Sequence, residues 1–148
     1  MNPVYAYCNR HLSVAHCWGQ ADCLTFAADW VREMHGVDPA ADLRMTYASF
    51  GECQRVTGFF TNPLGVVRPR LQALGFAETT RPRQGDVGIL LQLVTPSITR
   101  PFGAICLGAQ WACLSDQGLT LLMPQKVVAA WDMRFSEMDP AMKVLDHA

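Results

Sequence analysis

The sequence predicts an α+β domain in which a central helix near the N-terminus packs on an antiparallel sheet built from the C-terminal part of the chain. First, apolar residues recur at helical spacing directly after residue 22. Second, short apolar segments separated by glycine turns follow one another between residues 102 and 123, which is the pattern of an antiparallel meander. Third, the helical patterns precede the strand patterns, an order typical of α+β domains.

The central helix is predicted from Cys23 to Met34. Asp22 has the short carboxylate of a good N-cap, and Gly19 lets the preceding loop bend sharply. Gly36 supplies a left-handed C-terminal cap. One face of this helix is apolar and carries Cys23, Phe26, Ala27, Trp30, Val31 and Met34.

Five shorter helices and four strands are expected around it. The first four of these helices are placed at about 4–14, 39–47, 50–58 and 67–75, with a turn-rich loop at 59–65. The strands are placed at 87–94, 102–107, 110–114 and 119–123, with a turn at 96–101. Pro124 is expected to open a last short helix, through about residue 130.

Length and charge narrow the class of protein. The chain has 148 residues, which suits a single domain over 1–148 with a core at about 16–131 and a loosely held tail at 132–148. The formal net charge is -1 and there is no basic run, so we expect no nucleic-acid partner. No apolar run reaches the ~18 residues of a membrane span.

The six cysteines are spread along the chain without a CxxC pair and without a His/Cys cluster at zinc spacing. We therefore expect no metal and no cofactor. The chain begins Met-Asn-Pro, with no basic segment followed by an apolar run, so we expect reduced cysteines and synthesis in the cytoplasm.

Cys23 is the candidate site residue with the clearest chemistry. A thiol at the first helical position feels the positive end of the helix dipole, which favours the nucleophilic thiolate. The alternative is that Cys23 is a small buried apolar side chain. His16 is a weak candidate base because it is near Cys23 in sequence; the alternatives are a place on the surface or a capping role. Asp22 is a helix cap and a possible site member. Asp86 opens a predicted strand and Asp116 lies in a turn; a carboxylate could orient a base, but beside a thiol it would oppose thiolate formation.

Three segments carry a family resemblance. The first is the Trp18-Gly19-x-x-Asp22-Cys23 loop, the second is Arg83-x-Gly85-Asp86-Val87, and the third is the Gly-Ala-Ile-Cys-Leu-Gly sequence at 103–108. Together they resemble the papain-like cell-wall peptidases of the NlpC type. The longer stretch 18–31 with 36–41 looks like a group of small phage and gene-transfer-agent tail proteins related to those peptidases. The resemblance covers about residues 16–131.

The resemblance implies a papain-like NlpC-type fold, Cys23 as nucleophile, a histidine on a sheet strand as general base, and the peptide stem of the bacterial cell wall as substrate. Counting back from Gly108, the position of that histidine holds Phe102. The chain has four histidines, which are His11, His16, His35 and His147. None of them lies between residues 83 and 131.

Two functions remain open at this point. The first is a tail-tip or hub component of a phage-like particle, made in the bacterial cytoplasm and assembled into the tail, with other tail proteins as partners. Aromatic residues that look exposed would dock on them: Phe59, Phe60, Trp111 and Trp131. The second is a cysteine peptidase or amidase that opens peptidoglycan during genome delivery, with Cys23 as nucleophile and the base supplied by His16 or a partner chain.

Overall fold

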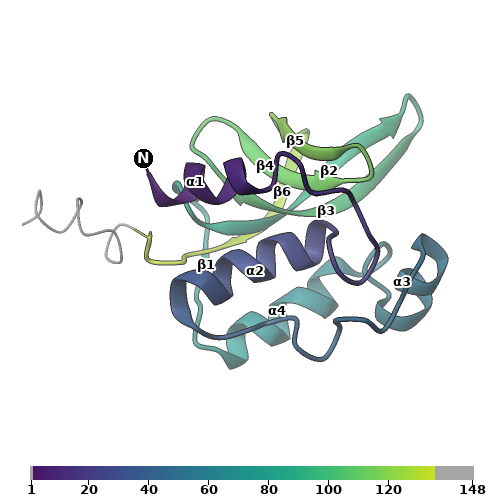
Figure 1. Cartoon of the computed structure of the whole chain (residues 1–148), viewed down its shortest axis with the longest axis horizontal. Helices are drawn as coiled ribbons and strands as arrows, with labels where there is room; N and C mark the ends of the chain where they lie inside the picture. Colours follow the sequence, from purple (N-terminus) through teal and green to yellow (C-terminus); the bar gives the residue numbers. More distant parts are fainter. Residues whose placement is uncertain (1, 136–148) are drawn as a thin grey trace, which may run out of the picture.

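The computed structural model describes residues 2–135 and has an α+β architecture (Figure 1). The described part contains helices α1 (Pro3–Arg10), α2 (Cys23–His35), α3 (Phe50–Thr57) and α4 (Pro63–Ala73). Its strands are β1 (Glu78–Thr79), β2 (Val87–Thr95), β3 (Ile98–Cys106), β4 (Trp111–Ser115), β5 (Gly118–Leu122) and β6 (Lys126–Trp131). They form one antiparallel sheet in the order β1-β6-β2-β3-β4-β5. The predicted α+β class, with an antiparallel sheet, is therefore confirmed.

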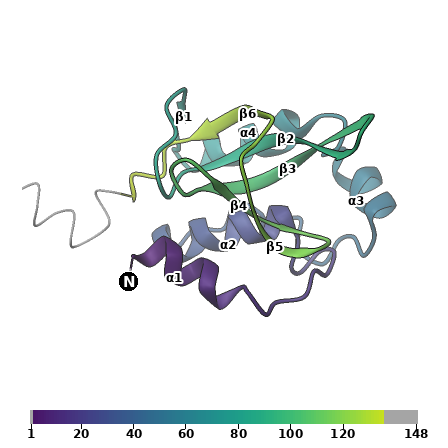
Figure 2. The ribbon, with the colours of Figure 1, turned by 90° about the horizontal axis from the view of Figure 1, so that it is seen from above.

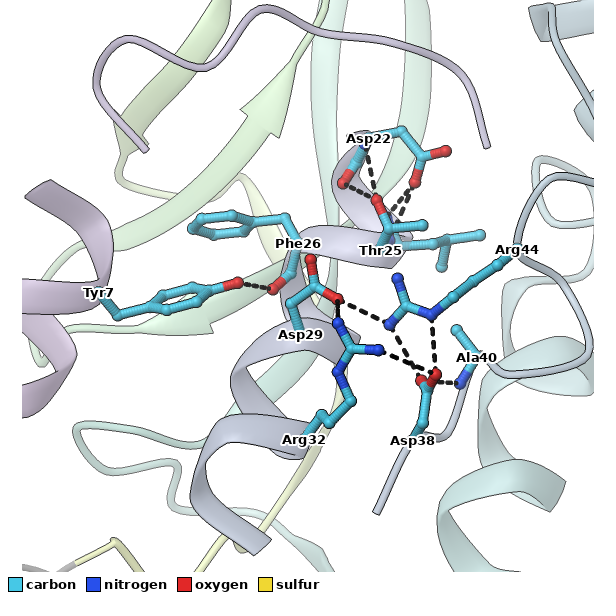
Figure 3. A network of polar contacts seen from close by, with 10 residues as sticks. Tyr7, Asp22, Thr25, Phe26, Asp29, Arg32, Asp38, Ala40 and Arg44 are labelled. Carbon is cyan, nitrogen blue, oxygen red and sulfur yellow. Dashed lines mark hydrogen bonds and ion pairs between the residues drawn. The ribbon is translucent and has the colours of Figure 1, made fainter. Parts of the chain in front are cut away.

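The predicted central helix is α2, which lies along the sheet (Figures 1 and 2) and contacts β3 and β4. Asp22 and Thr25 form a capping box at its start, and Gly36 ends it in the left-handed conformation. Phe26, Trp30 and other apolar side chains of α2 are buried against the sheet. The α1 helix joins this layer through the Tyr7 hydroxyl, which donates a hydrogen bond to the Phe26 carbonyl at 2.6 Å (Figure 3).

The β2–β3 hairpin is longer than expected. Its register runs from Val87 opposite Ile105 to Leu93 opposite Thr99, so the turn predicted at 96–101 is wrong except at its first residues. Pro101 suggested a turn, yet it lies within β3. β3 pairs with β4 only at Ile105 and Cys106, so Pro101 has a paired strand on one side alone, and a proline is tolerated where no N–H donor is needed.

The predicted helix at 124–130 is also wrong, because this segment is strand β6. It lies between β1 and β2 in the sheet, and Trp131 is opposite Val87 of β2. Pro124 stands before the strand and not inside a helix. The β-branched Val127 and Val128 favour a strand, and Val127 pairs with Leu90 of β2, while Val128 falls at a shift in the register.

The predicted helix at 39–47 is replaced by a series of turns. The Arg44 guanidinium bonds Asp38 at 2.8 Å and Asp29 of α2 at 2.7 Å, and Asp38 also accepts the Ala40 backbone N–H at 3.0 Å (Figure 3). These contacts hold the segment against α2. The helix propensity of the segment that begins at Pro39 is therefore outweighed by ion pairs, which the sequence pattern does not reveal.

Two helix boundaries differ from expectation. The α1 helix ends at Arg10, and α4 begins at Pro63, inside the segment predicted as a loop. Asn62 caps α4 by accepting the Gly65 backbone N–H at 3.1 Å, and proline suits the first helical position. The α3 helix occupies the predicted range, with Ser49 as its cap.

Apolar clusters cover both faces of the sheet. One contains Phe26 and Trp30 of α2 with Ile89, Ile105 and Trp131 of the strands. The other lies on the opposite face and contains Leu90, Ala104, Cys106, Trp111, Cys113 and Ala130.

The first cluster extends beyond the predicted core range of 16–131. It includes Val4 and Tyr7 on one side, and Met133 and Phe135 on the other. The expectation of a loose tail is thus wrong for 132–135, because packing and a hydrogen bond from the Met133 backbone N–H to Asp86 fix this segment. Residues 136–148, with His147, lie outside the described residues. In the described part no helix is long and apolar enough to cross a membrane.

Candidate functional site

Asp22 organises the loop in front of α2. Its carboxylate accepts hydrogen bonds from the backbone N–H groups of Gly19 (2.9 Å), Leu24 (3.0 Å) and Thr25 (2.9 Å), and from the Tyr47 hydroxyl (2.9 Å). The side chain is 1% exposed, and Figure 3 shows it turned toward the first turn of the helix. The candidate site residue Asp22 is therefore engaged in holding the loop and the helix start together.

The loop fits tightly against residues 45–47. The Met45 backbone N–H donates to the Gly19 carbonyl at 3.0 Å. Gly19 has φ +79°, and a Cβ there would come within 2.3 Å of the Tyr47 carbonyl oxygen. Burial and the nearby Asp22 charge raise the pKa of Tyr47, so its hydroxyl stays protonated as a donor.

Cys23 is the first residue of α2 and is 7% exposed. Its side chain belongs to an apolar cluster with buried Leu43, Phe59 and Val66, against which the partly buried Leu24, Phe60, Val67 and Phe102 pack. Burial raises the pKa of the Cys23 thiol well above its ordinary value, and the Asp22 charge raises it further. A hydrogen bond from the Gly103 backbone acts in the opposite direction without reversing the shift. The thiol is consequently protonated at neutral pH.

Gly103 of β3 touches the start of α2. A Cβ at this position would lie 2.9 Å from the Cys23 carbonyl oxygen and 3.7 Å from the Leu24 Cα. Only a glycine allows the strand and the helix to approach so closely. The neighbouring Phe102 stands where the resemblance leads us to expect a histidine. It packs against the Cys23 cluster and also against the cluster of Leu90 and Ala104.

The histidines have other partners. The His16 ring meets the Trp18 ring at 4.7 Å between centroids, and His11 stacks on Tyr7 at 4.3 Å. The His35 Nε2 lies 2.8 Å from the Met133 carbonyl oxygen. Within residues 2–135 no hydrogen bond joins a histidine to Cys23. The structure thus brings together Cys23, Asp22 and Phe102, and gives His16 an aromatic contact instead of the thiol.

An aromatic–arginine cluster beside the Cys23 cluster was not foreseen as a unit. It consists of Trp18, Phe50, Phe60 and Arg100. The ring centroids of Phe50 and Phe60 are 4.3 Å apart, and the Trp18 ring lies 6.0 Å from Phe50 and 6.2 Å from Phe60. The guanidinium carbon of Arg100 lies 4.3 Å from the Phe50 centroid and 5.7 Å from that of Phe60. No sequence spacing brings these four residues together, because they come from separate elements.

The aromatic residues that we expected on a docking surface are mostly buried. Phe59 and Trp131 are 0% exposed and Trp111 is 3% exposed, so the expectation is wrong for these three. They fill the apolar clusters around the sheet and the Cys23 side chain. Phe60 is partly exposed and belongs to the aromatic–arginine cluster.

No metal centre is found in the described part of the chain, where no group of three or more His, Cys, Asp and Glu side chains could hold an ion. A cavity of about 50 Å³ between α2 and α4 is lined almost wholly by apolar side chains. Leu24 and Gly103 border this cavity, but Cys23 does not. The only buried side-chain polar atom found without a partner in residues 2–135 is the indole nitrogen of Trp131.

Comparison with known proteins gives one match. A family model described as a domain of unknown function (DUF6950) matches residues 2–133, which is nearly the whole chain. No curated protein and no solved structure matches the chain.

Proposed function

Because the chain belongs to the DUF6950 family, whose description assigns no activity, we propose its function from the site. We propose that it is a papain-like, NlpC-type domain that has lost catalysis and serves as an assembly component in the tail tip or hub of a phage-like particle. The observation that carries this proposal is the phenyl ring of Phe102, which packs against the apolar cluster around Cys23. The resembled peptidases use an imidazole at that position.

The electrostatics of Cys23 support a loss of catalysis. A cysteine nucleophile acts as a thiolate and needs a neighbouring base to form it. Burial and the charge of Asp22 raise the pKa of this thiol, while the only described opposing influence is a backbone hydrogen bond from Gly103. A phenyl ring neither accepts a proton nor stabilises a thiolate by pairing with it.

The local architecture supports a peptidase-like fold that is retained for packing and not for catalysis. The Asp22 hydrogen bonds fix the loop and the helix start, and the close approach of Gly103 seats that start on β3. This arrangement of a cysteine at a helix start beside a strand is what the NlpC resemblance implies. In the proposed function it is a packing unit.

Exposed apolar residues support a role in binding neighbouring proteins. Leu93 is 48% exposed, Val94 40% and Ile98 52%, all at the outer end of the β2–β3 hairpin, which extends toward the side of α3 (Figures 1 and 2). Exposed apolar patches on soluble proteins commonly mark contact surfaces. In the proposed function the partners are other tail-tip or hub proteins.

Native alkylation with iodoacetamide at pH 7 tests the loss of catalysis. Exposed Cys17 is first replaced in a Cys17→Ser variant, and labelling of Cys23 is followed by peptide mass spectrometry. We expect slow labelling of Cys23 until the protein is unfolded, and no cleavage of purified peptidoglycan. Rapid labelling, with a cleavage activity that disappears in Cys23→Ala, would instead establish the cysteine peptidase.

Co-expression tests the assembly role. The chain is produced together with the proteins encoded by the genes beside its own, and any assembled particles are isolated and analysed for its presence. We expect the chain and its Cys23→Ala variant to be incorporated equally. Absence from particles, together with no association with any neighbouring tail protein, would contradict the proposal.

A further inference from the structure

We propose that the aromatic–arginine cluster of Trp18, Phe50, Phe60 and Arg100 binds an acidic segment of a partner protein, in which a carboxylate stands next to an apolar side chain. This inference rests on the proposed function, because it names the chemistry of the assembly partner. The surface of this cluster does not include the Cys23 thiol. None of the four residues of the cluster has been assigned a role in catalysis.

Arg100 supplies the charge. In residues 2–135 its guanidinium makes no hydrogen bond and no ion pair, and its described contacts are with the rings of Phe50 and Phe60. Seven other arginines of the described part form ion pairs with Asp or Glu: Arg10, Arg32, Arg44, Arg55, Arg68, Arg70 and Arg83. Stacking on two rings holds the Arg100 fork while its N–H donors remain available for a carboxylate.

The rings supply the apolar part of the surface. Phe50 is 38% exposed, and Trp18 and Phe60 are partly exposed. Phe50 starts α3, Phe60 follows that helix, and Trp18 precedes α2, so three segments form one face. Aromatic residues and Arg are enriched in the core of protein interfaces, and Trp and Arg are among the types that dominate the binding energy there.

The cluster is built on a rigid base. Phe60 packs on the Cys23 cluster, as does Phe102, two residues after Arg100 on β3. Residues two apart on a strand face the same side, so Arg100 extends the row begun by Phe102. Since the rings and the arginine are held before a partner arrives, binding does not have to order them.

Charge complementarity selects the partner. An unpaired guanidinium over two aromatic rings favours a planar carboxylate with an apolar neighbour, and it disfavours a basic or purely apolar segment. Asp or Glu next to Phe, Trp or Leu in an extended stretch of a neighbouring tail protein has this chemistry.

Isothermal titration with short peptides tests the inference. The probes are acetylated and amidated pentapeptides that combine two Asp residues with one Phe, Trp or Leu, and the matched peptides carry Asn in place of Asp. We expect the acidic peptides to bind at least about tenfold more tightly than the Asn peptides, and to lose affinity at 0.5 M salt, as a charge-assisted contact requires.

Arginine variants identify the site. Arg100→Gln is expected to weaken binding of the acidic peptides about tenfold or more, and Arg100→Lys to weaken it less, because lysine keeps the charge and loses the planar fork. Arg134→Gln is the matched control, since Arg134 also lies over a phenyl ring, that of Phe76 at 5.3 Å, and has no ion pair in the described residues. It should bind like the unaltered protein.

Three results with the acidic peptides would overturn the inference. They are no binding of any acidic peptide at 1 mM, on the order of the weakest affinities that such titrations detect, equal binding of the Asp and Asn peptides, and equal effects of Arg100→Gln and Arg134→Gln. Binding of a peptidoglycan stem peptide in place of the acidic peptides would also overturn it, by moving the ligand from a protein to the cell wall. If the chain still enters particles, these results contradict the acidic partner alone; failure to assemble contradicts the proposed function.

Discussion

The Tyr47 hydroxyl donates a hydrogen bond to the Asp22 carboxylate at 2.9 Å, and the two residues are 3% and 1% exposed. This bond joins the turns after α2 to the loop before it. We expect Tyr47→Phe to lower the free energy of unfolding by about 1.5–3 kcal/mol, the usual worth of a hydrogen bond to a charged group. Urea unfolding measures the loss. Tyr5→Phe is the control. Because Tyr5 is 43% exposed, removing its hydroxyl should change the free energy of unfolding little.

Gly103→Ala tests the close approach of β3 to α2. The added Cβ would lie 2.9 Å from the Cys23 carbonyl oxygen, a backbone atom that cannot move aside cheaply. We expect a destabilisation of about 1–3 kcal/mol, as for other overpacked cores. Gly51→Ala is the control, because it lies in α3 with nothing within 4 Å, and helix propensity should make it neutral or slightly stabilising. Equal thermal stability of the two variants would contradict the tight contact.

The Asp38–Arg44 contact predicts a pH-dependent contribution to stability. Hydrogen bonding to Arg44 lowers the pKa of Asp38 below its unfolded value. The stabilisation is therefore complete above the unfolded pKa of about 4 and is lost as the pH falls through the folded pKa. Urea unfolding at pH 6 should show Asp38→Asn less stable by about 1–2 kcal/mol, and the difference should shrink at pH 2.5. A difference that stays constant between the two pH values would refute the linkage.

Phe102→His tests what the missing imidazole means for Cys23. Because the ring of residue 102 packs on the Cys23 cluster, an imidazole there would be a proton acceptor near the thiol. In a Cys17→Ser background we expect alkylation of Cys23 at pH 7 to be about tenfold faster than in the parent. Phe102→Leu is the control for loosened packing. Equal rates in the two variants would show that position 102 does not control the thiol.

Local signals predicted the parts of the fold that depend on neighbours in sequence. Asp22 and Gly36 mark the ends of α2 because capping involves only adjacent backbone groups. The segment at 39–47 was misjudged since its conformation depends on Arg44 reaching Asp29 in another element. The strand at 126–131 was mistaken for a helix because its identity comes from pairing with β2, which no local pattern records.

The candidate site was predictable in its elements and less so in its environment. The helix start placed Cys23 correctly, and helical position alone favoured a reactive thiol. The burial that raises its pKa comes from residues such as Phe59 and Val66, distant in sequence. The stacking of Arg100 on Phe50 was likewise hidden, because it joins a sheet hairpin to a helix.

The attachment of α2 to the sheet also bears on the order in which the protein folds. The Trp30 indole donates to the Gly85 carbonyl across 55 positions of sequence, and His35 meets the Met133 carbonyl across 98. Closing such long loops lowers the conformational entropy of the chain. The strand contacts that compensate for this loss form only afterwards. A nascent chain synthesised only to Ala73 contains all four described helices and none of the described strands. The apolar face of α2 then has no sheet to cover it, so stable folding must wait until the strands have left the ribosome.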